Sequence, residues 1–163
     1  GLLCMGLCCE RGRGVPLNKE EAAKWYRKAA EQGEEDGMCC LGFLYEIGEG
    51  VEQSWSEAVK WYRKAAEQED PRGLFCMARA YDYGLGVQQD AKEAVRWYER
   101  AAQAGSAPAM CDLGVCYERG EGVEQDIDHA AALYRNWETR RDSVIWVFAM
   151  RPAGVWSRAG KRR

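Results

Sequence analysis

The chain has 163 residues, of which 47% are hydrophobic and 30% are charged, an ordinary balance for a helical protein. No apolar run approaches the ~18 residues that a membrane-spanning helix needs, which excludes a membrane span. The net charge of −3 conceals an asymmetry: residues 1–139 carry 16 Lys and Arg against 25 Asp and Glu, whereas residues 140–163 carry 7 against 1. An acidic body argues against a nucleic-acid-binding surface.

A Gly-x-Gly-Val motif recurs through the chain, and its first glycines are Gly12, Gly48, Gly84 and Gly120, a constant spacing of 36 residues. A fixed period of this length is typical of a solenoid, in which each unit contacts its neighbours. We therefore expect an all-α chain of about four helix-turn-helix repeats, over 1–33, 34–69, 70–105 and 106–139. Gly1 begins in mid-motif, so the first repeat is expected to be truncated and the chain to be a fragment.

The second repeat shows how each unit is built. Its first helix is predicted over about 36–47, because Met38, Leu41 and Tyr45 fall on one stripe at helical spacing. A small residue recurs on that stripe, here Gly42, and we expect it to let a neighbouring backbone approach closely. Gly48 is placed to end the helix in the left-handed conformation.

The second helix of each repeat is predicted to begin at a good N-cap residue, namely Asn18, Ser54, Asp90 and Asp126. A glutamate three residues later predicts a capping box in three of the four copies. The fourth copy has His129 there, the chain's one histidine, which we interpret as a surface substitution. The Trp-Tyr and Ala-Ala pairs that follow share a face and are expected to form the core between repeats.

These motifs resemble the Sel-one-like repeat (SLR) family, relatives of the tetratricopeptide repeats. The resemblance covers about 1–138, and in the second repeat it is carried by Leu41-Gly42, Tyr45, Gly48-Glu49-Gly50-Val51, Ala58, Trp61-Tyr62 and Ala65-Ala66. It implies a right-handed superhelix of antiparallel helix pairs. It also implies a non-enzymatic adaptor or scaffold, whose first helices line a concave groove that binds a protein or peptide.

The eight cysteines all fall in predicted first helices. A cysteine-rich bacterial branch of the family carries regular disulfides and has been linked to β-lactam binding, but the cysteines here do not follow its pattern. We interpret them mainly as small buried hydrophobic residues, with a disulfide or a metal or redox role as alternatives. Free thiols favour a reducing, cytoplasmic compartment.

The sequence contains few of the residue combinations that enzymes use for catalysis. A single histidine and the absence of a Ser-x-x-Lys motif leave no visible nucleophile–base pair, so no catalytic residue, cofactor or metal is predicted. The alternative function is a cysteine-rich secreted repeat protein with a hydrolase-like or small-ligand-binding activity.

An acidic residue recurs at the last turn of every first helix: Glu10, Glu46, Asp82 and Glu118. A carboxylate there faces the negative end of the helix dipole, so something should compensate it. One interpretation is pairing with Lys or Arg of a neighbouring helix, or solvation. The other is that the row borders the groove and attracts a basic partner segment. The remaining expected groove residues are Asp36, Cys39, Phe43, Arg72, Phe75, Arg79, Cys111 and Val115, with Phe43 and Phe75 as exposed anchors.

The basic segment 140–163 breaks the repeat. We expect a short capping helix over the fourth repeat, with a disordered tail as the alternative. Contact with nucleic acid or anionic lipid through Lys161-Arg162-Arg163 is a further alternative. The sequence thus predicts a monomeric scaffold that binds a protein or peptide, with a basic segment of the partner as one option, and no nucleic acid.

Overall fold

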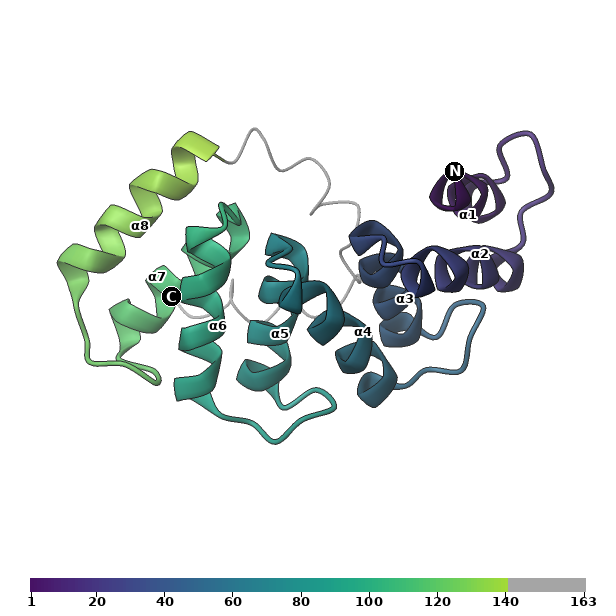
Figure 1. The fold of residues 1–163 in the computed structure, drawn as a ribbon. Helices are drawn as coiled ribbons and strands as arrows, with labels where there is room; N and C mark the ends of the chain where they lie inside the picture. The colour runs from purple at the N-terminus through teal and green to yellow at the C-terminus, as the bar shows by residue number, and fades with distance from the viewer. Residues whose placement is uncertain (141–163) are drawn as a thin grey trace.

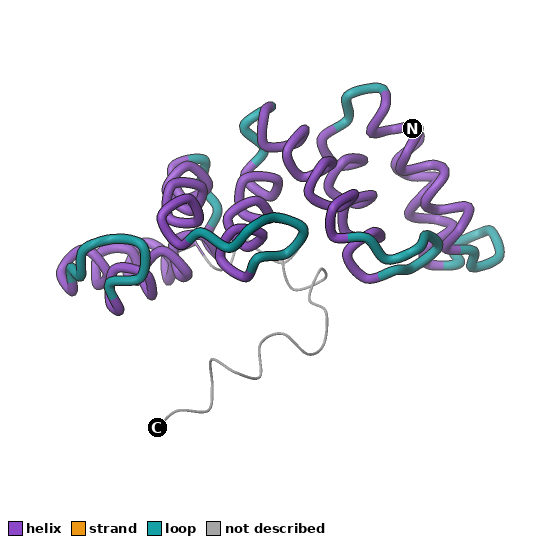
Figure 2. Tube along the Cα trace, turned by 90° about the horizontal axis from the view of Figure 1, so that it is seen from below, coloured by secondary structure: helices purple, strands orange, loops and turns teal. Residues whose placement is uncertain are grey.

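The computed structural model describes residues 1–140, and every element in that range is a helix (Figure 2). The expected capping helix over 142–150 lies outside the described residues. The bounds are α1 Leu2–Arg11, α2 Lys19–Glu31, α3 Glu35–Ile47, α4 Trp55–Glu67, α5 Pro71–Tyr83, α6 Ala91–Gln103, α7 Ala107–Arg119 and α8 Ile127–Arg140. The all-α prediction is confirmed.

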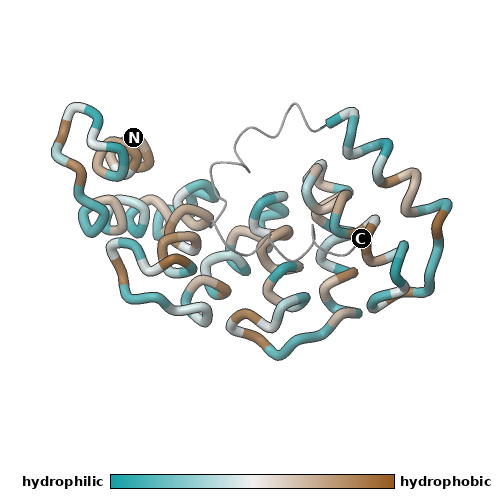
Figure 3. Tube along the Cα trace, turned by 180° about the vertical axis from the view of Figure 1, so that it is seen from behind, coloured by the Kyte–Doolittle hydropathy of each residue, from teal (hydrophilic) through white to brown (hydrophobic). Residues whose placement is uncertain are grey.

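The eight helices form four pairs that follow one another in an open arc from α1 to α8 (Figure 1). Each helix packs on the helix before it and the helix after it in the chain. Hydrophobic and hydrophilic stretches alternate along the helices, as expected where one side of each is buried (Figure 3). The architecture is the predicted superhelix of helix pairs, and no described helix is long and apolar enough to cross a membrane.

The repeated glycine motif ends each first helix as predicted. Gly12, Gly48, Gly84 and Gly120 all adopt the left-handed conformation, with φ between 64° and 72°. Each cap N–H donates to the carbonyl four residues earlier, which satisfies one of the carbonyls left open at a helix end.

The capping box forms only in part. The Asn18 side chain accepts a hydrogen bond from Glu21 N at 3.0 Å, and the Ser54 side chain accepts one from Glu57 N at 3.3 Å. The second bond of the predicted capping box, from the N-cap N–H to the glutamate side chain, does not form. The N-cap N–H donates instead to a carbonyl of the preceding helix, as Ser54 N does to Tyr45 O at 2.9 Å. The N-cap thus ties the two helices of a repeat together.

The small residue on each first helix also has a different role from the predicted one. A Cβ added at Gly42 would lie 2.6 Å from the Tyr62 ring, so the glycine makes room for an aromatic side chain rather than for a backbone. The close approach of backbones occurs at Gly37, where a Cβ would lie 2.8 Å from Ala30 N of the preceding repeat. The Ala-Ala pair therefore seats the next first helix, as expected of the core between repeats.

The second glycine of the loop docks on the preceding repeat in the second, third and fourth repeats. A Cβ on Gly50 would lie 2.2 Å from Lys19 O, and a Cβ on Gly122 would lie 2.2 Å from Ala91 O, in each case at the start of the previous second helix. Gly14 has the same left-handed backbone, φ +75°, but nothing lies within 4 Å of its added Cβ. The Gly-x-Gly loop is therefore a contact between repeats as well as a turn.

This difference provides a matched pair of substitutions. We expect Gly14→Ala and Gly50→Ala each to lose about 1 kcal/mol for the left-handed backbone. Gly50→Ala should lose a further ~1–3 kcal/mol, because its Cβ displaces the loop from Lys19. Urea unfolding followed by circular dichroism measures both losses, and equal values would contradict a docking role for Gly50.

Candidate protein-binding surface on the first helices

The acidic row is compensated by tyrosine hydroxyl groups of the second helices. Tyr26, Tyr62, Tyr98 and Tyr134 each donate to the acid 16 residues earlier, at 2.5, 2.8, 3.2 and 2.8 Å respectively. This partner was not among the interpretations drawn from sequence. The acid lies one helical turn after the small residue on the same face of the first helix, as Glu46 follows Gly42. The tyrosine ring therefore lies over the glycine while its hydroxyl reaches the carboxylate.

The acids differ in how much of the carboxylate remains accessible. Glu46 is only 4% exposed and also forms an ion pair with Arg79 of the next repeat at 3.6 Å. Glu10 and Asp82 are half-buried, and Glu118 is exposed. Burial raises the pKa of Tyr62 well above its ordinary value, so its hydroxyl stays protonated and remains a donor to Glu46. Glu118 thus offers the most accessible carboxylate of the row, and Glu46 offers almost none.

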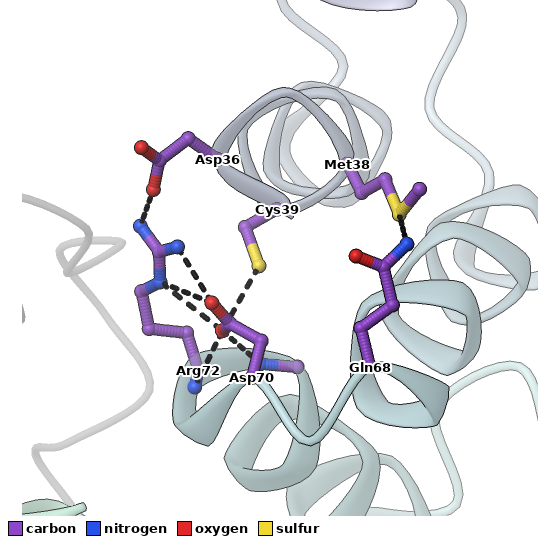
Figure 4. Close-up of polar contacts among 7 residues, drawn as sticks. Asp36, Met38, Cys39, Gln68, Asp70 and Arg72 are labelled. Atoms are coloured by element: carbon purple, nitrogen blue, oxygen red, sulfur yellow. Dashed lines mark hydrogen bonds and ion pairs between the residues drawn. The ribbon is translucent and has the colours of Figure 1, made fainter. Parts of the chain in front are cut away.

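A polar clasp joins the second and third repeats (Figure 4). The Asp70 side chain caps α5 by accepting from Gly73 N at 3.1 Å, and it also accepts from the Arg72 guanidinium at 2.7 Å. Arg72 pairs in addition with Asp36 of α3. The buried Cys39 thiol donates to Asp70 at 3.6 Å, so side chains of both repeats contact the Asp70 carboxylate, and Asp36 is linked to it through Arg72.

Three of the predicted groove residues are buried. Cys39 is 1% exposed and Phe75 is 7% exposed, and the Phe75 ring lies 6.1 Å from that of Tyr98. The expectation that Phe75 is an exposed anchor is wrong, because it packs into the core of the third repeat. Glu46 is the third. Buried side chains can shape a surface but cannot themselves make the main contacts with a partner.

The other predicted residues retain some accessible surface. Asp36 and Glu118 are exposed, and the half-buried members are Glu10, Phe43, Arg72, Arg79, Asp82, Cys111 and Val115. The eight cysteines are free thiols in the structure. No group of three or more His, Cys, Asp and Glu side chains within residues 1–140 is arranged to hold a metal ion.

Sequence reasoning missed two residues of this surface. Tyr83, at the end of α5, is 52% exposed, and the negative Asp112 and Asp82 lie close enough to raise its pKa, although burial is the larger cause. Asp112 occupies the position that is Cys40 in the second repeat, so periodicity alone assigned it no special role. The change from cysteine to aspartate at this repeated position was the signal in the sequence that could have identified Asp112.

Comparison with known proteins identifies the family. The Sel1 repeat matches residues 3–34, 36–70, 71–106 and 107–136. The chain belongs to the Sel1 repeat family. Proteins of this family are typically non-enzymatic scaffolds for protein interaction, which supports a protein-binding role here. No curated protein matches.

Solved structures agree on the fold. A Sel1 repeat protein from Oxalobacter formigenes is 37% identical with a TM-score of 0.81, over 85% of this chain and 57% of that one. A protective antigen of uropathogenic Escherichia coli with an SLR fold is 32% identical with a TM-score of 0.81, over 85% of this chain and 30% of that one. Cysteine-rich protein B of Helicobacter pylori, 21% identical with a TM-score of 0.59 over 74% and 86% of the two chains, shares the fold alone. The chain thus spans less than two thirds of the length of the first protein and about a third of the second.

The tyrosine–carboxylate bond should matter most where the acid is buried. Tyr62→Phe should lower the free energy of unfolding by about 1–3 kcal/mol, because it leaves the buried Glu46 carboxylate short of a donor. Tyr134→Phe should cost no more than about 0.5 kcal/mol, since water can replace the hydroxyl at exposed Glu118. Chemical unfolding of the two variants gives the comparison, and equal losses would refute the dependence on burial.

Asp70 should make stability depend on pH at the acidic end. Burial alone would raise its pKa, but the hydrogen bonds from Arg72 and from Gly73 N outweigh burial and lower the pKa. Its stabilisation is therefore present above the unfolded-state pKa of 3.8 and is lost as pH falls through the lower folded-state pKa.

Asp70→Asn should accordingly cost about 2 kcal/mol at pH 7, and the cost should shrink as the pH falls below 3.8. Asp36→Asn is the control at the exposed end of the same clasp and should cost no more than about 0.5 kcal/mol. Thermal unfolding from pH 2.5 to pH 7 tests this; a cost for Asp70→Asn that is constant with pH would disprove it.

Proposed function

We propose that this Sel1 repeat chain is a protein-interaction scaffold that binds a basic segment of a protein partner on its first helices, at the third and fourth repeats. The observation that supports this most is the grouping of accessible acids there. Asp82 and Asp112 are half-buried, Glu118 is exposed, and the aromatic Tyr83 beside Asp82 is 52% exposed. Exposed aromatic side chains next to charges are common anchors for peptides.

The charges of the earlier repeats support this choice of location. Glu46 is neutralised by Arg79, and Asp36 is neutralised by Arg72, both within the scaffold. The fourth repeat has Val115 at the position of Arg79 and Pro108 at the position of Arg72, so these two cations are not repeated there. A Lys or Arg side chain of a partner would supply the missing positive charge.

The remaining expected groove residues enter this proposal in two ways. Glu10, Phe43, Cys111 and Val115 are accessible enough to extend the contact surface. Buried Cys39, Phe75 and Glu46, together with Arg72 and Arg79, hold the first helices in register and act on a partner through that arrangement.

A selection from random displayed peptides, with the full chain as bait, tests the proposal. We expect enriched peptides to carry Lys or Arg beside an aromatic or aliphatic residue. Tyr83→Ala and Glu118→Lys should each weaken their binding about tenfold, roughly 1.4 kcal/mol. Leu17→Ala and Glu67→Lys are matched controls, because Leu17 is an exposed apolar residue in a loop and Glu67 is an exposed acid on a second helix.

Three outcomes separate the alternatives. Loss of binding in the Tyr83 and Glu118 variants alone would support the proposed surface. Equal loss in the control variants, or enrichment of acidic peptides, would overturn it. Loss on deletion of residues 141–163 with the repeat variants unaffected would assign binding to the basic C-terminal segment instead.

A further inference from the structure

The junction between the third and fourth repeats differs from the two earlier junctions at one recurring position of the first helix. That position is Cys40 in α3 and Cys76 in α5, and it is Asp112 in α7. Each lies near the tyrosine of the preceding repeat, since Cys40 acts on Tyr26, Cys76 on Tyr62, and Asp112 on Tyr98. A thiol beside the tyrosine hydroxyl is thus replaced by a carboxyl group.

The tyrosine of this junction is also placed differently. The first helices carry glycine beneath the tyrosine ring in three repeats, where an added Cβ would come within 2.4–2.6 Å of the ring, but the third repeat carries Ala78. A ring above alanine has to sit farther out. Consistent with this, the Tyr98 hydroxyl lies 3.2 Å from Asp82, whereas the other three tyrosine–acid distances are 2.5–2.8 Å.

Tyr98 therefore lies between two carboxyl groups with one proton to offer. A tyrosine hydroxyl donates one hydrogen bond and otherwise only accepts. When it donates to Asp82, Asp112 can bond to the same oxygen only as a protonated acid that donates. When both carboxyl groups are ionised, one of them faces the other without a donor from Tyr98.

The surroundings remove this conflict only in part. Arg79 favours the ionised form of both acids, but it is also paired with Glu46 at 3.6 Å, and Val115 occupies the matching position of α7. The titratable groups that face the pair from α5, α6, α7 and the following loop are Arg79, Tyr83, Tyr98, Cys111, Cys116 and Glu121. Glu121 adds negative charge near Asp82.

We propose that Asp82, Tyr98 and Asp112 form a proton-dependent joint between the third and fourth repeats, which packs firmly while the two carboxyl groups share a proton and loosens when both are ionised. The joint shares Asp82 and Asp112 with the proposed binding surface, but it is tested below without a binding partner, so the two proposals can fail separately. Its consequence is that the angle or mobility of α7 and α8 against α5 and α6 responds to pH near neutrality.

The direction of the effect follows from the protonation states. Burial is the main cause that raises the pKa of Asp112 to about 7, and Asp82 raises it further, whereas Arg79 and Tyr98 lower it. The folded chain therefore holds a proton that the unfolded chain releases near pH 3.8. The stabilisation is complete below pH 3.8 and is lost as the pH rises through 7.

The experiment compares the full chain with Asp112→Cys, which restores the residue of the earlier junctions, and with the nearly isosteric Asp112→Asn. All proteins carry His129→Gln, so that no imidazole titrates. From pH 5.5 to 8.5 the unfolding equilibrium constant of the parent should rise at least tenfold more than that of either variant. The same pH dependence in parent and variants would overturn the proposal.

Two local measurements keep the test independent of global stability. Amide hydrogen exchange, corrected for the intrinsic effect of pH, should show α7 and α8 losing protection relative to α3 and α4 in the parent but not in Asp112→Asn. The carbon chemical shift of the Asp112 carboxyl group should titrate near pH 7, and Ala78→Gly should raise that midpoint, because it draws Tyr98 toward Asp82 and away from Asp112, whose pKa Tyr98 lowers. Uniform exchange across the helices, or a midpoint near 4, would overturn the proposal.

Discussion

A hydrogen bond between a tyrosine and a carboxylate joins the two helices of each repeat, and the tyrosine is buried in the first three repeats. The tyrosine comes from the second helix, lies across a glycine or alanine of the first helix, and bonds to an acid one turn later. The acid lies at the C-terminal end of the first helix, where the helix dipole is negative and disfavours a carboxylate. The hydrogen bond donated by the tyrosine hydroxyl compensates for this. One side chain thereby fixes both the distance and the rotation between the two helices.

Contacts between repeats use a different set of small residues. The Ala-Ala pair of one second helix receives a glycine of the next first helix, as Ala29 and Ala30 receive Gly37, and the Gly50 loop rests on the start of the preceding second helix. These positions permit little variation in size, and Gly37 and Gly73 make the same contact at the first two junctions. The side chains that do vary, such as Cys40, Cys76 and Asp112, change the chemistry of a junction.

Periodicity predicted the helices, their ends and the core, because these depend on residues close together in sequence. It did not predict the partner of the acidic row. A constant spacing of 16 residues separates each acid from its tyrosine, as between Glu46 and Tyr62. Because the two residues lie on different helices joined by a loop, helical periodicity does not predict that they are in contact. The burial of Phe75 was missed for a related reason, since whether that side of the first helix faces solvent or Tyr98 depends on how the repeats stack. The reciprocal half of the capping box failed because Tyr45 O competed for the same N–H.

The same comparison explains why irregular positions are the informative ones in a repeat protein. A residue that recurs in every copy, such as the tyrosine or the first loop glycine, serves the geometry that all copies share. Departures from the pattern must be accommodated locally. Glu69, for example, adopts the left-handed conformation, φ 58°, that glycine takes at Gly33 and Gly105, and it pairs with Arg100 at 2.6 Å. Asp112 departs from the pattern at a half-buried position next to a second acid, where accommodation requires either a proton or a cation. A scaffold of uniform repeats can therefore acquire a local response to its surroundings through a single substitution, provided that the tyrosine–carboxylate bond beneath it is kept.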